Sequence, residues 1–314
     1  MTTYIIRRLL QTVVVLLLVS FFCFSLIHVI PGDPVRMMLG PLALEEEIAF
    51  RTAQLGLDKP FFVQYGTWLV NALQGDFGQS MRYQMPVAKL FLERFPITIY
   101  LSFLAMIISV VLGISTGIIS AVRRASFLDQ SLVMLATTGL CIPIFWLGIL
   151  SIYLFGLYLG WLPIQGYVMP NVDFWESARY SIMPAILLAI PSLAIMARQT
   201  RSSMLEVVRQ DYIRTAAAKG LSERVIVLKH ALKNALIPVV TLLGIQVRIL
   251  LGGSVLVETV FNIPGMGRLL VDAAFNKDFF IVQGGVLILG VVVCLANLIV
   301  DISYGWLDPR VRYE

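Results

Sequence analysis

The sequence predicts an all-α, polytopic membrane protein of about six transmembrane helices, with a hydrophilic insert between the fourth and fifth. Of the 314 residues, 58% are hydrophobic and only 14% are charged, whereas about a quarter of the residues in a soluble domain are charged. The mean hydropathy is +0.85, and several apolar runs reach the roughly 20 residues that a helix needs to cross a bilayer. A β-barrel would show short alternating segments instead.

Six apolar segments form the predicted spans. They lie at 9–30, 97–121, 131–160, 181–197, 236–256 and 281–304. The first is too long for the apolar region of a signal peptide and ends without a small-residue cleavage site, so we interpret it as a retained span. Because proline removes a backbone hydrogen bond inside a helix, we expect kinks at Pro143 in the third span and at Pro184 and Pro191 in the fourth.

Lysine and arginine gather on one side of these spans, which predicts that this side and both termini are cytoplasmic. The insert alone has eight basic and three acidic residues. The other basic residues of this side are Arg7, Arg8, Arg123, Arg124, Arg310 and Arg312. The opposite short loops contain only Arg179, Arg268 and Lys277. Membrane insertion selects such a basic face, which can also attract lipid headgroups or an acidic partner.

The segment 31–95 then lies outside the membrane. It is too long for a simple turn, and its apolar pattern predicts amphipathic helices at 42–57 and 65–73. We expect a small ordered substructure on the outer membrane surface. It is either a packing cap or a docking surface for an external partner or substrate.

Common catalytic and cofactor motifs are absent from the sequence. No G-x-x-x-x-G-K-[ST] loop occurs, so any ATP that drives transport is hydrolysed by another subunit. The string Gly113-Ile114-Ser115-Thr116-Gly117 lies within a span and predicts a helix contact between small residues rather than a nucleophile elbow, and Gly156 with Gly160 is interpreted in the same way. Three cysteines and two histidines without metal-ligand spacing predict neither a disulfide framework nor a metal site.

One charged residue lies deep in a predicted span. Arg248 follows Leu236 by twelve residues, which is roughly 18 Å along a helix. A charge at that depth normally faces a cavity or a partner. We therefore place Arg248, together with the span proline Pro143, on the candidate translocation path, where an anionic substrate group could pair with the guanidinium. Bonding to backbone carbonyls is the alternative for Arg248.

The insert contains residues that are typical of the beginnings and ends of short helices. The fourth span is predicted to continue as a helix to about Val208, Asp211 to act as the N-cap of a short helix, and Gly220 to end that helix in a left-handed conformation. Ser222 is expected to cap a further helix that runs to Leu236, and Pro238 suits the start of the fifth span. The candidate coupling residues are Asp211, Tyr212, Arg214, Thr215, Ala216, Ala217, Ala218, Lys219 and Gly220. The three alanines make a thin helix that can enter a partner's groove.

This insert resembles the coupling segment, or EAA loop, of ABC importer permeases. The runs DYIRTAAAKGLSE and HALKNALIP are similar to those of the B-type permeases of the dipeptide, oligopeptide and nickel group, which also includes glutathione transporters. Further matches cover nearly the whole chain. They are Arg7-Arg8-Leu9-Leu10, Pro31-Gly32-Asp33-Pro34, Leu55-Gly56-Leu57-Asp58 with Pro60, Gly75-Asp76-Phe77-Gly78 with Ser80, Glu258 to Gly267, and Leu307 to Tyr313. Two residues depart from the pattern: Arg214 stands where the broader motif begins with glutamate, and Arg248 where an apolar or small residue is usual.

The resemblance implies a type I ABC importer fold and a permease subunit that is not itself an enzyme. It implies a second homologous permease, two ATPase subunits that hold the ATP and Mg, and an extracytoplasmic solute-binding protein, with no cofactor or nucleic acid bound by this chain. The implied parts are a helix at 1–30, an extracytoplasmic segment at 31–95, a core at 96–304 with the coupling segment 198–235, and a cytoplasmic tail at 305–314.

The resemblance predicts the class of transporter but leaves several substrates open. Dipeptides, oligopeptides and glutathione-like peptides fit the resemblance, and a nickel chelate is the alternative within the same group. A stand-alone secondary transporter is a further alternative from another class. It would be expected to show several intramembrane carboxylates or an inverted repeat, which this sequence lacks.

Overall fold

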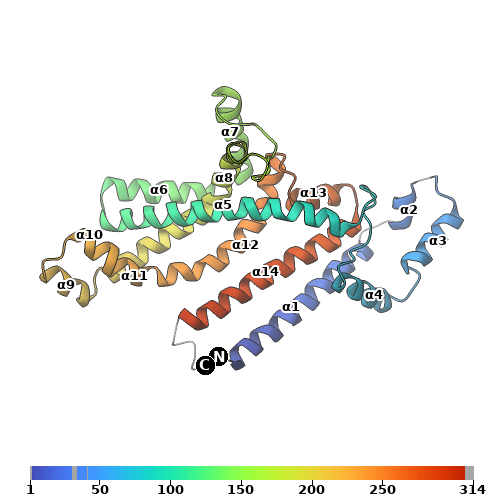
Figure 1. The fold of residues 1–314 in the computed structure, drawn as a ribbon, viewed down its shortest axis with the longest axis horizontal. Coiled ribbons are helices and arrows are strands. Elements are labelled where there is room, and N and C mark those ends of the chain that lie inside the picture. The colour runs from blue at the N-terminus through green and yellow to red at the C-terminus, as the bar shows by residue number, and fades with distance from the viewer. Residues whose placement is uncertain (1, 30–33, 41, 308–314) are drawn as a thin grey trace. The chain divides into compact units, whose positions relative to one another are not determined.

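The computed structural model describes residues 2–29, 34–40 and 42–307, and these are mainly helical with no β-strand among them. Figure 1 shows the helices in chain order. The α-helices before the insert are α1 (Thr2–Val29), α2 (Pro34–Leu39), α3 (Glu45–Leu55), α4 (Phe61–Leu73), α5 (Val87–Val122), α6 (Phe127–Cys141), α7 (Ile144–Ser151) and α8 (Phe174–Val207). Those after α8 are α9 (Asp211–Ala218), α10 (Glu223–Val225), α11 (Leu232–Ala235), α12 (Ile237–Val260), α13 (Met266–Phe275) and α14 (Phe279–Leu307). Two π-helical stretches are η1 (Ile152–Tyr158) and η2 (Ile226–Ala231).

The spans agree with the predicted number. Within the described residues, five helices are long and apolar enough to cross a membrane, and a sixth span results if one bent pair is counted as a unit. The five lie in α1, α5, α8, α12 and α14. Pro184 and Pro191 lie inside the continuous helix α8, and Pro96, which the span boundaries left out, lies inside α5.

The predicted third span, 131–160, is wrong as a single kinked helix. It is a pair of segments, Phe127–Cys141 and Ile144–Tyr158, whose axes meet at 103°. The residue before a proline avoids the α-helical conformation, and Ile142 is accordingly extended, with φ −86° and ψ 129°. Pro143 then becomes the N-cap of α7. The proline therefore ends one helix and starts another.

The chain divides into two compact units. The first comprises residues 1–97 and 265–298, and the second comprises 98–264 and 299–314. The four-part division into 1–30, 31–95, 96–304 and 305–314 stays a prediction. Residues 308–314 of the predicted tail lie outside the described residues, and α14 extends to Leu307.

In the first unit, α4 is attached to α1 by aromatic side chains. Phe24 of α1 lies 5.3 Å from Phe61 and 5.6 Å from both Tyr65 and Trp68, measured between ring centroids. The hydroxyls of Ser20 and Tyr65 are 2.8 Å apart. These contacts confirm an ordered substructure in the segment after α1. Its helices α3 and α4 overlap the two predicted helices, while α2 was not predicted.

A second attachment in this unit joins the loop before α5 to the start of α14. The buried carboxylate of Asp278 accepts hydrogen bonds from the Ser80 hydroxyl at 2.6 Å and the Arg82 amide at 3.2 Å. Helix α13, which was not predicted, packs Met266 and Leu269 into the core beside α5. Figure 1 shows α14 running beside α1, and a Cβ on Gly290 would come within 3.1 Å of Val19.

In the second unit, α8 is the helix that α6, α7, α11 and α12 all contact. Two glycines of α5 also meet it. A Cβ on Gly113 would lie 2.7 Å from Cβ of Met196, and one on Gly117 would lie 2.5 Å from Cβ of Thr200. The predicted small-residue helix contact is therefore confirmed, and its Ser115 is not a nucleophile elbow.

The prediction that Gly156 and Gly160 form a helix contact between small residues is wrong. Gly160 lies beyond the end of η1 with φ +64°, and no atom would meet its Cβ within 4 Å. A Cβ on Gly156 would meet Ile164 of the following loop, at 3.1 Å. The second glycine supplies the left-handed residue that turns the chain, which glycine adopts at low cost.

The contact between α5 and α8 gives a matched test. Gly117→Ala places its Cβ 2.7 Å from the Ala197 carbonyl, so we expect the free energy of unfolding to fall by about 1–3 kcal/mol through overpacking. Gly252→Ala, in α12, meets no atom within 4 Å, and is expected to be neutral or stabilising by up to about 1 kcal/mol because alanine is the better helix former. Denaturant unfolding of both variants in detergent measures the difference. Equal stabilities would contradict the close contact.

Candidate coupling site and membrane path

The candidate coupling helix α9 follows shortly after the end of α8. Helix α8 continues past its apolar part to Val207, with Val208 as its C-cap, in agreement with the predicted continuation. A turn closed by the hydrogen bond from the Gln210 amide to the Val207 carbonyl, 3.1 Å, then leads into α9. The membrane helix and the coupling helix are therefore joined by three residues.

Helix α9 begins one residue earlier than predicted. Gln210, not Asp211, is the N-cap, with an extended backbone and no side-chain capping bond. Asp211 is the first helical residue, where its negative charge still favours the positive end of the helix dipole, and its carboxylate lies 3.6 Å from Arg214. The end is as predicted: Gly220 has φ +78°, and its amide donates to the Ala217 carbonyl at 2.9 Å.

One face of α9 is buried within the second unit. Ile213 and Ala216, three residues apart and hence on one side of the helix, are 5% and 7% exposed. Ile213 packs in a cluster that also contains Ala121 of α5 and Met204 of α8. Ala231 and Ala235, after α9, complete the cluster. This base, which we call the coupling base, fixes α9 to helices on both sides of it in sequence.

The other face of α9 is exposed. It presents Asp211, Tyr212, Arg214, Thr215, Ala217, Ala218, Lys219 and Gly220. The alanine triplet is therefore divided: Ala216 is buried, and only Ala217 and Ala218 are accessible to a partner. Tyr212 is additionally oriented by Asn234 of α11, whose side-chain amide donates to the phenol oxygen at 2.8 Å.

The segment after α9 is less regular than predicted. Ser222 stands at the N-cap position but makes no side-chain capping bond. The single helix expected from there to Leu236 is divided by the π-helical η2 between α10 and α11. Pro238 is at the start of α12, as predicted.

The sequence pattern did not predict an ion pair next to the coupling base. Both carboxylate oxygens of Asp129, in α6, accept from the guanidinium of Arg201, in α8, at 2.8 Å. Asp129 also bonds to the Ser120 hydroxyl of α5 and accepts from the Ala125 amide at 2.9 Å. Its side chain is only 3% exposed. This arrangement, the three-helix clamp, ties α5, α6 and α8 together. An aspartate three residues after the possible N-cap Ser126 was the available sequence signal.

The two candidate path residues lie on different elements of the second unit. Arg248 is exposed on α12, and no hydrogen bond or ion pair of its side chain is found among the described residues. Pro143 is exposed at the break between α6 and α7. Close to Arg248, Gln246 is fully buried, and neither polar atom of its amide has a hydrogen-bond partner within the described part of the chain.

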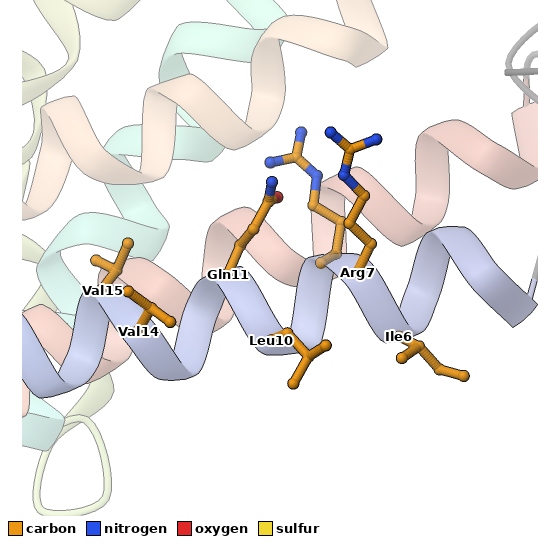
Figure 2. Close-up of a pocket in the computed structure, with 7 residues that line it drawn as sticks. Ile6, Arg7, Leu10, Gln11, Val14 and Val15 are labelled. Carbon is orange, nitrogen blue, oxygen red and sulfur yellow. The ribbon is translucent and has the colours of Figure 1, made fainter.

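A wide hollow along α1 is a poor candidate for a ligand site. Its volume is about 880 Å³, but its lining comes from one helix. Figure 2 shows Arg7 and Gln11 on one side of that helix and the apolar Ile6 and Leu10 on the other. Leu10 is 62% exposed, as expected for a side chain that faces lipid. No group of three or more potential metal ligands occurs among the described residues.

The comparisons with known proteins identify the family. The profile described as binding-protein-dependent transport system inner membrane component matches residues 113–313, and the profile for the N-terminal part of such membrane components matches 1–102. The chain belongs to this family. It is a permease subunit of an ABC importer and a multi-pass inner-membrane protein.

Curated relatives match over their full length. The permease is 43% identical to a probable peptide ABC transporter permease of Sinorhizobium fredii, over 100% of both chains. It is 43% identical to the glutathione transport system permease protein GsiC of Escherichia coli and 40% identical to the dipeptide transport system permease protein DppB of Alkalihalophilus pseudofirmus, again over 100% of each chain.

The solved structures confirm the predicted importer fold. An inward-facing structure of the MetNI methionine ABC transporter aligns with a TM-score of 0.58 and 18% identity, over 70% of the permease and 96% of that chain. A second crystal form gives a TM-score of 0.56 with 20% identity. At such identities the likeness concerns the fold alone.

The three-helix clamp can be tested against an exposed ion pair. Asp129→Asn leaves the Arg201 guanidinium without its counter-charge, so we expect the free energy of unfolding to fall by about 3 kcal/mol. Glu176→Gln removes the exposed pair with Arg179 and is expected to cost less than about 1 kcal/mol. Denaturant titration of both variants in detergent measures the two losses. A loss for Asp129→Asn no larger than that for Glu176→Gln would show that the clamp is not a stabilising contact.

Proposed function

We propose that the exposed face of α9 is the surface through which this permease is driven by a separate ATPase subunit. The observation that carries the proposal is the division of the helix into a buried and an exposed face. Ile213 attaches α9 to the coupling base and Ala216 is buried on the same face, while Ala217 and Ala218 are small and accessible. A helix that is thin on its outer side can enter a cleft, and Arg214 and Lys219 then lie at the rim.

The coupling base explains how motion of α9 would reach the membrane helices. Met204 and Ala121 connect α9 to α8 and α5, and Ala235 connects it to the segment that leads into α12. Closely packed side chains transmit a displacement rather than absorb it. A pull on α9 that accompanies ATP-driven closure would therefore re-tilt α8 and α12 together. The two states differ in their contacts with the ATPases, which is what allows the nucleotide to shift the equilibrium.

The proposed assembly contains two permeases, two ATPase subunits and an extracytoplasmic solute-binding protein, within the lipid bilayer. The relatives are permeases of ABC transporters, and the family description names dependence on a binding protein. In this assembly ATP and Mg belong to the ATPases, and the permease is not an enzyme. Both termini and α9 face the cytoplasm, which the basic residues of that side support.

The proposed cargo is a short peptide: a dipeptide, an oligopeptide or a glutathione-like peptide. Three relatives that match over their full length are named as peptide, glutathione and dipeptide permeases. A nickel chelate remains the alternative cargo within the same group. A stand-alone secondary transporter is not supported, because the family consists of binding-protein-dependent components.

Arg248 is proposed to face the path, which would form between the permease and its partner permease. Its side chain is exposed on an apolar helix, and a charge in such a helix is costly unless it meets water or a counter-charge. A peptide carboxylate is one such counter-charge. Pro143 would widen the path by ending α6.

The coupling role is tested by charging the exposed face. Ala217→Glu is expected to lower ATP-dependent peptide uptake at least tenfold while ATP hydrolysis continues, because a long charged side chain no longer fits a cleft. Ala217→Ser preserves the small size and should transport normally. Uptake and hydrolysis are measured on the same reconstituted complexes, with thermal unfolding as the folding control. Transport by Ala217→Glu at the rate of Ala217→Ser would exclude this face from coupling.

If Arg248 faces the translocation path, its substitution should change peptide uptake in a different way. Arg248→Gln is expected to lower peptide uptake several-fold with normal complex assembly, and to lower it more for free peptides than for peptides with an amidated C-terminus. The reason is that only the free carboxylate can pair with the guanidinium. Competition uptake in membrane vesicles measures the two substrates. An equal loss for both substrates would place Arg248 outside substrate contact.

A further inference from the structure

Helix α4 lies against the part of α1 where the apolar run of that helix ends. The run extends over Ile6–Ser25. The α4 residues that contact α1 recur at intervals of three and four, so they share one face of the helix. They are Phe61, Gln64, Tyr65 and Trp68. Their partners on α1 extend from His28, which is beyond the run, inward to Ser20.

These contacts fix the depth of α4 relative to the span. The hydroxyl of Ser20 lies 2.8 Å from that of Tyr65, and Ser20 is roughly 7.5 Å inside the end of the apolar run at Ser25. The ring of Phe24, one residue inside that end, lies 5.3 to 5.6 Å from three rings of α4. Helix α4 therefore meets α1 near the boundary between acyl chains and headgroups.

The opposite face of α4 is also apolar, and it is exposed. Phe62 and Leu73 are 75% and 81% exposed, and Val63 and Val70 are about half exposed. A helix that is apolar on all sides is normally surrounded by protein or by lipid rather than by water. The exposed face therefore needs a partner, and its surroundings indicate which one.

The charges around α4 are placed as in a helix that lies in the membrane boundary. No charged residue occurs in 60–75, whereas Asp58 and Lys59 directly precede this stretch and Asp76 directly follows it. All three charged residues are exposed. With 13 residues, α4 is too short to cross a bilayer. Both of its ends can therefore stay at the headgroups while its middle enters the hydrocarbon.

The polar side chains in the middle of α4 do not need water. Nε2 of Gln64 donates to the carbonyls of Leu57 and Lys59 at 3.0 and 2.7 Å. The Thr67 hydroxyl donates to the Val63 carbonyl of its own helix at 2.9 Å. Such internal bonding is what acyl chains demand, because they offer no hydrogen-bond partner.

The exposed face of α4 continues the exposed surface of the span in α1. Phe22 of α1 is exposed and lies within the apolar run. Its ring centroid is 6.1 Å from that of Phe21, which is 5.8 Å from that of Phe61. The ring of Phe61 is in turn 5.5 Å from that of Phe62. The exposed rings of both helices thus belong to one series of contacts, and lipid that covers Phe22 reaches Phe62.

We propose that α4 is an interfacial helix whose exposed face inserts into a phospholipid leaflet. Phe62, Val70 and Leu73 lie among the upper acyl chains, at the depth of about 5–10 Å that such helices reach. Lys59 and Asp76 remain at the headgroups. With both termini cytoplasmic, as proposed above, this leaflet is the outer one. The helix anchors the extracytoplasmic segment in the bilayer and attaches it to the end of α1.

Spin labels on α4 measure its depth in the assembled transporter. The full-length permease carries Cys23→Ala, Cys141→Ala and Cys294→Ala and is reconstituted with its accompanying subunits in phosphatidylcholine nanodiscs. Val70→Cys or Leu73→Cys then carries a single nitroxide. Collisions with oxygen, which concentrates in hydrocarbon, are compared with collisions with chromium oxalate, which stays in water. We expect the oxygen collision rate to exceed the chromium oxalate rate at least threefold at both sites.

Phe50 of α3 provides the matched control. It is also a large apolar residue and is 69% exposed, but Glu47 and Arg51 are close to it in the same short helix. A label at Phe50→Cys should therefore collide more often with chromium oxalate than with oxygen. Equal collision ratios at Phe50 and Val70 would overturn the proposal, because the charge-free stretch would then not decide which helix enters the lipid.

The collision rates also separate lipid from the other possible surroundings. More chromium oxalate than oxygen collisions at Val70 and Leu73 would place the face in water. Low rates with both reagents would show that a protein, such as the partner permease, covers it. Either result would overturn the proposal.

An added charge tests the same face independently. Val70→Glu introduces a carboxylate that is costly among acyl chains, so the label at Leu73 is expected to shift at least twofold towards chromium oxalate. Phe50→Glu should leave that label unchanged. An unchanged ratio in Val70→Glu would contradict insertion, and the labels on the otherwise unaltered helix decide the question even if Val70→Glu does not assemble.

Discussion

The bond between Arg201 and Asp129 is the constraint on which the second unit depends. Helix α8 carries the contacts of four other helices and then continues into α9, so its position decides where the coupling helix lies. The clamp fixes it to α6 through Asp129 and to α5 through Ser120. Removing these charges from water offsets much of their attraction, so the net stabilisation by the pair is smaller than the loss expected when one partner is removed.

Close packing of small residues works together with this charge pairing. Gly113 and Gly117 let the backbone of α5 approach α8 until no side-chain atom fits between them. One turn further, the alanines of the coupling base do the same for α9. Small residues at both levels give dispersion contacts over a continuous surface, which is the main attraction available between helices in a bilayer. Because this packed surface is continuous, it makes the structure rigid from the contact between α5 and α8 to α9.

The first unit is built on a different principle. Besides the apolar cluster that joins α5, α13 and α14, its helices are joined by aromatic rings and by polar bonds at their ends, such as those of Asp278 to Ser80 and Arg82. A cavity of about 300 Å³ lies in this unit, and it is bounded by turns whose backbone is fixed by Gln64 and Asp76.

The helical class, the number of spans and the end of α9 at Gly220 were predictable from the residues, because they depend on local hydrophobicity and on the conformational freedom of one glycine. The family followed from a long series of short motifs. The helix break at Pro143 was harder to predict, since a proline in a span can either kink or end a helix, and the neighbouring packing selects between the two. Asp129 with Arg201, the burial of Ala216 apart from Ala217, and the packing of α4 against α1 depend on residues distant in sequence. Such pairings arise only when the helices pack, because a helix alone shows which face is apolar but not which neighbour that face will meet.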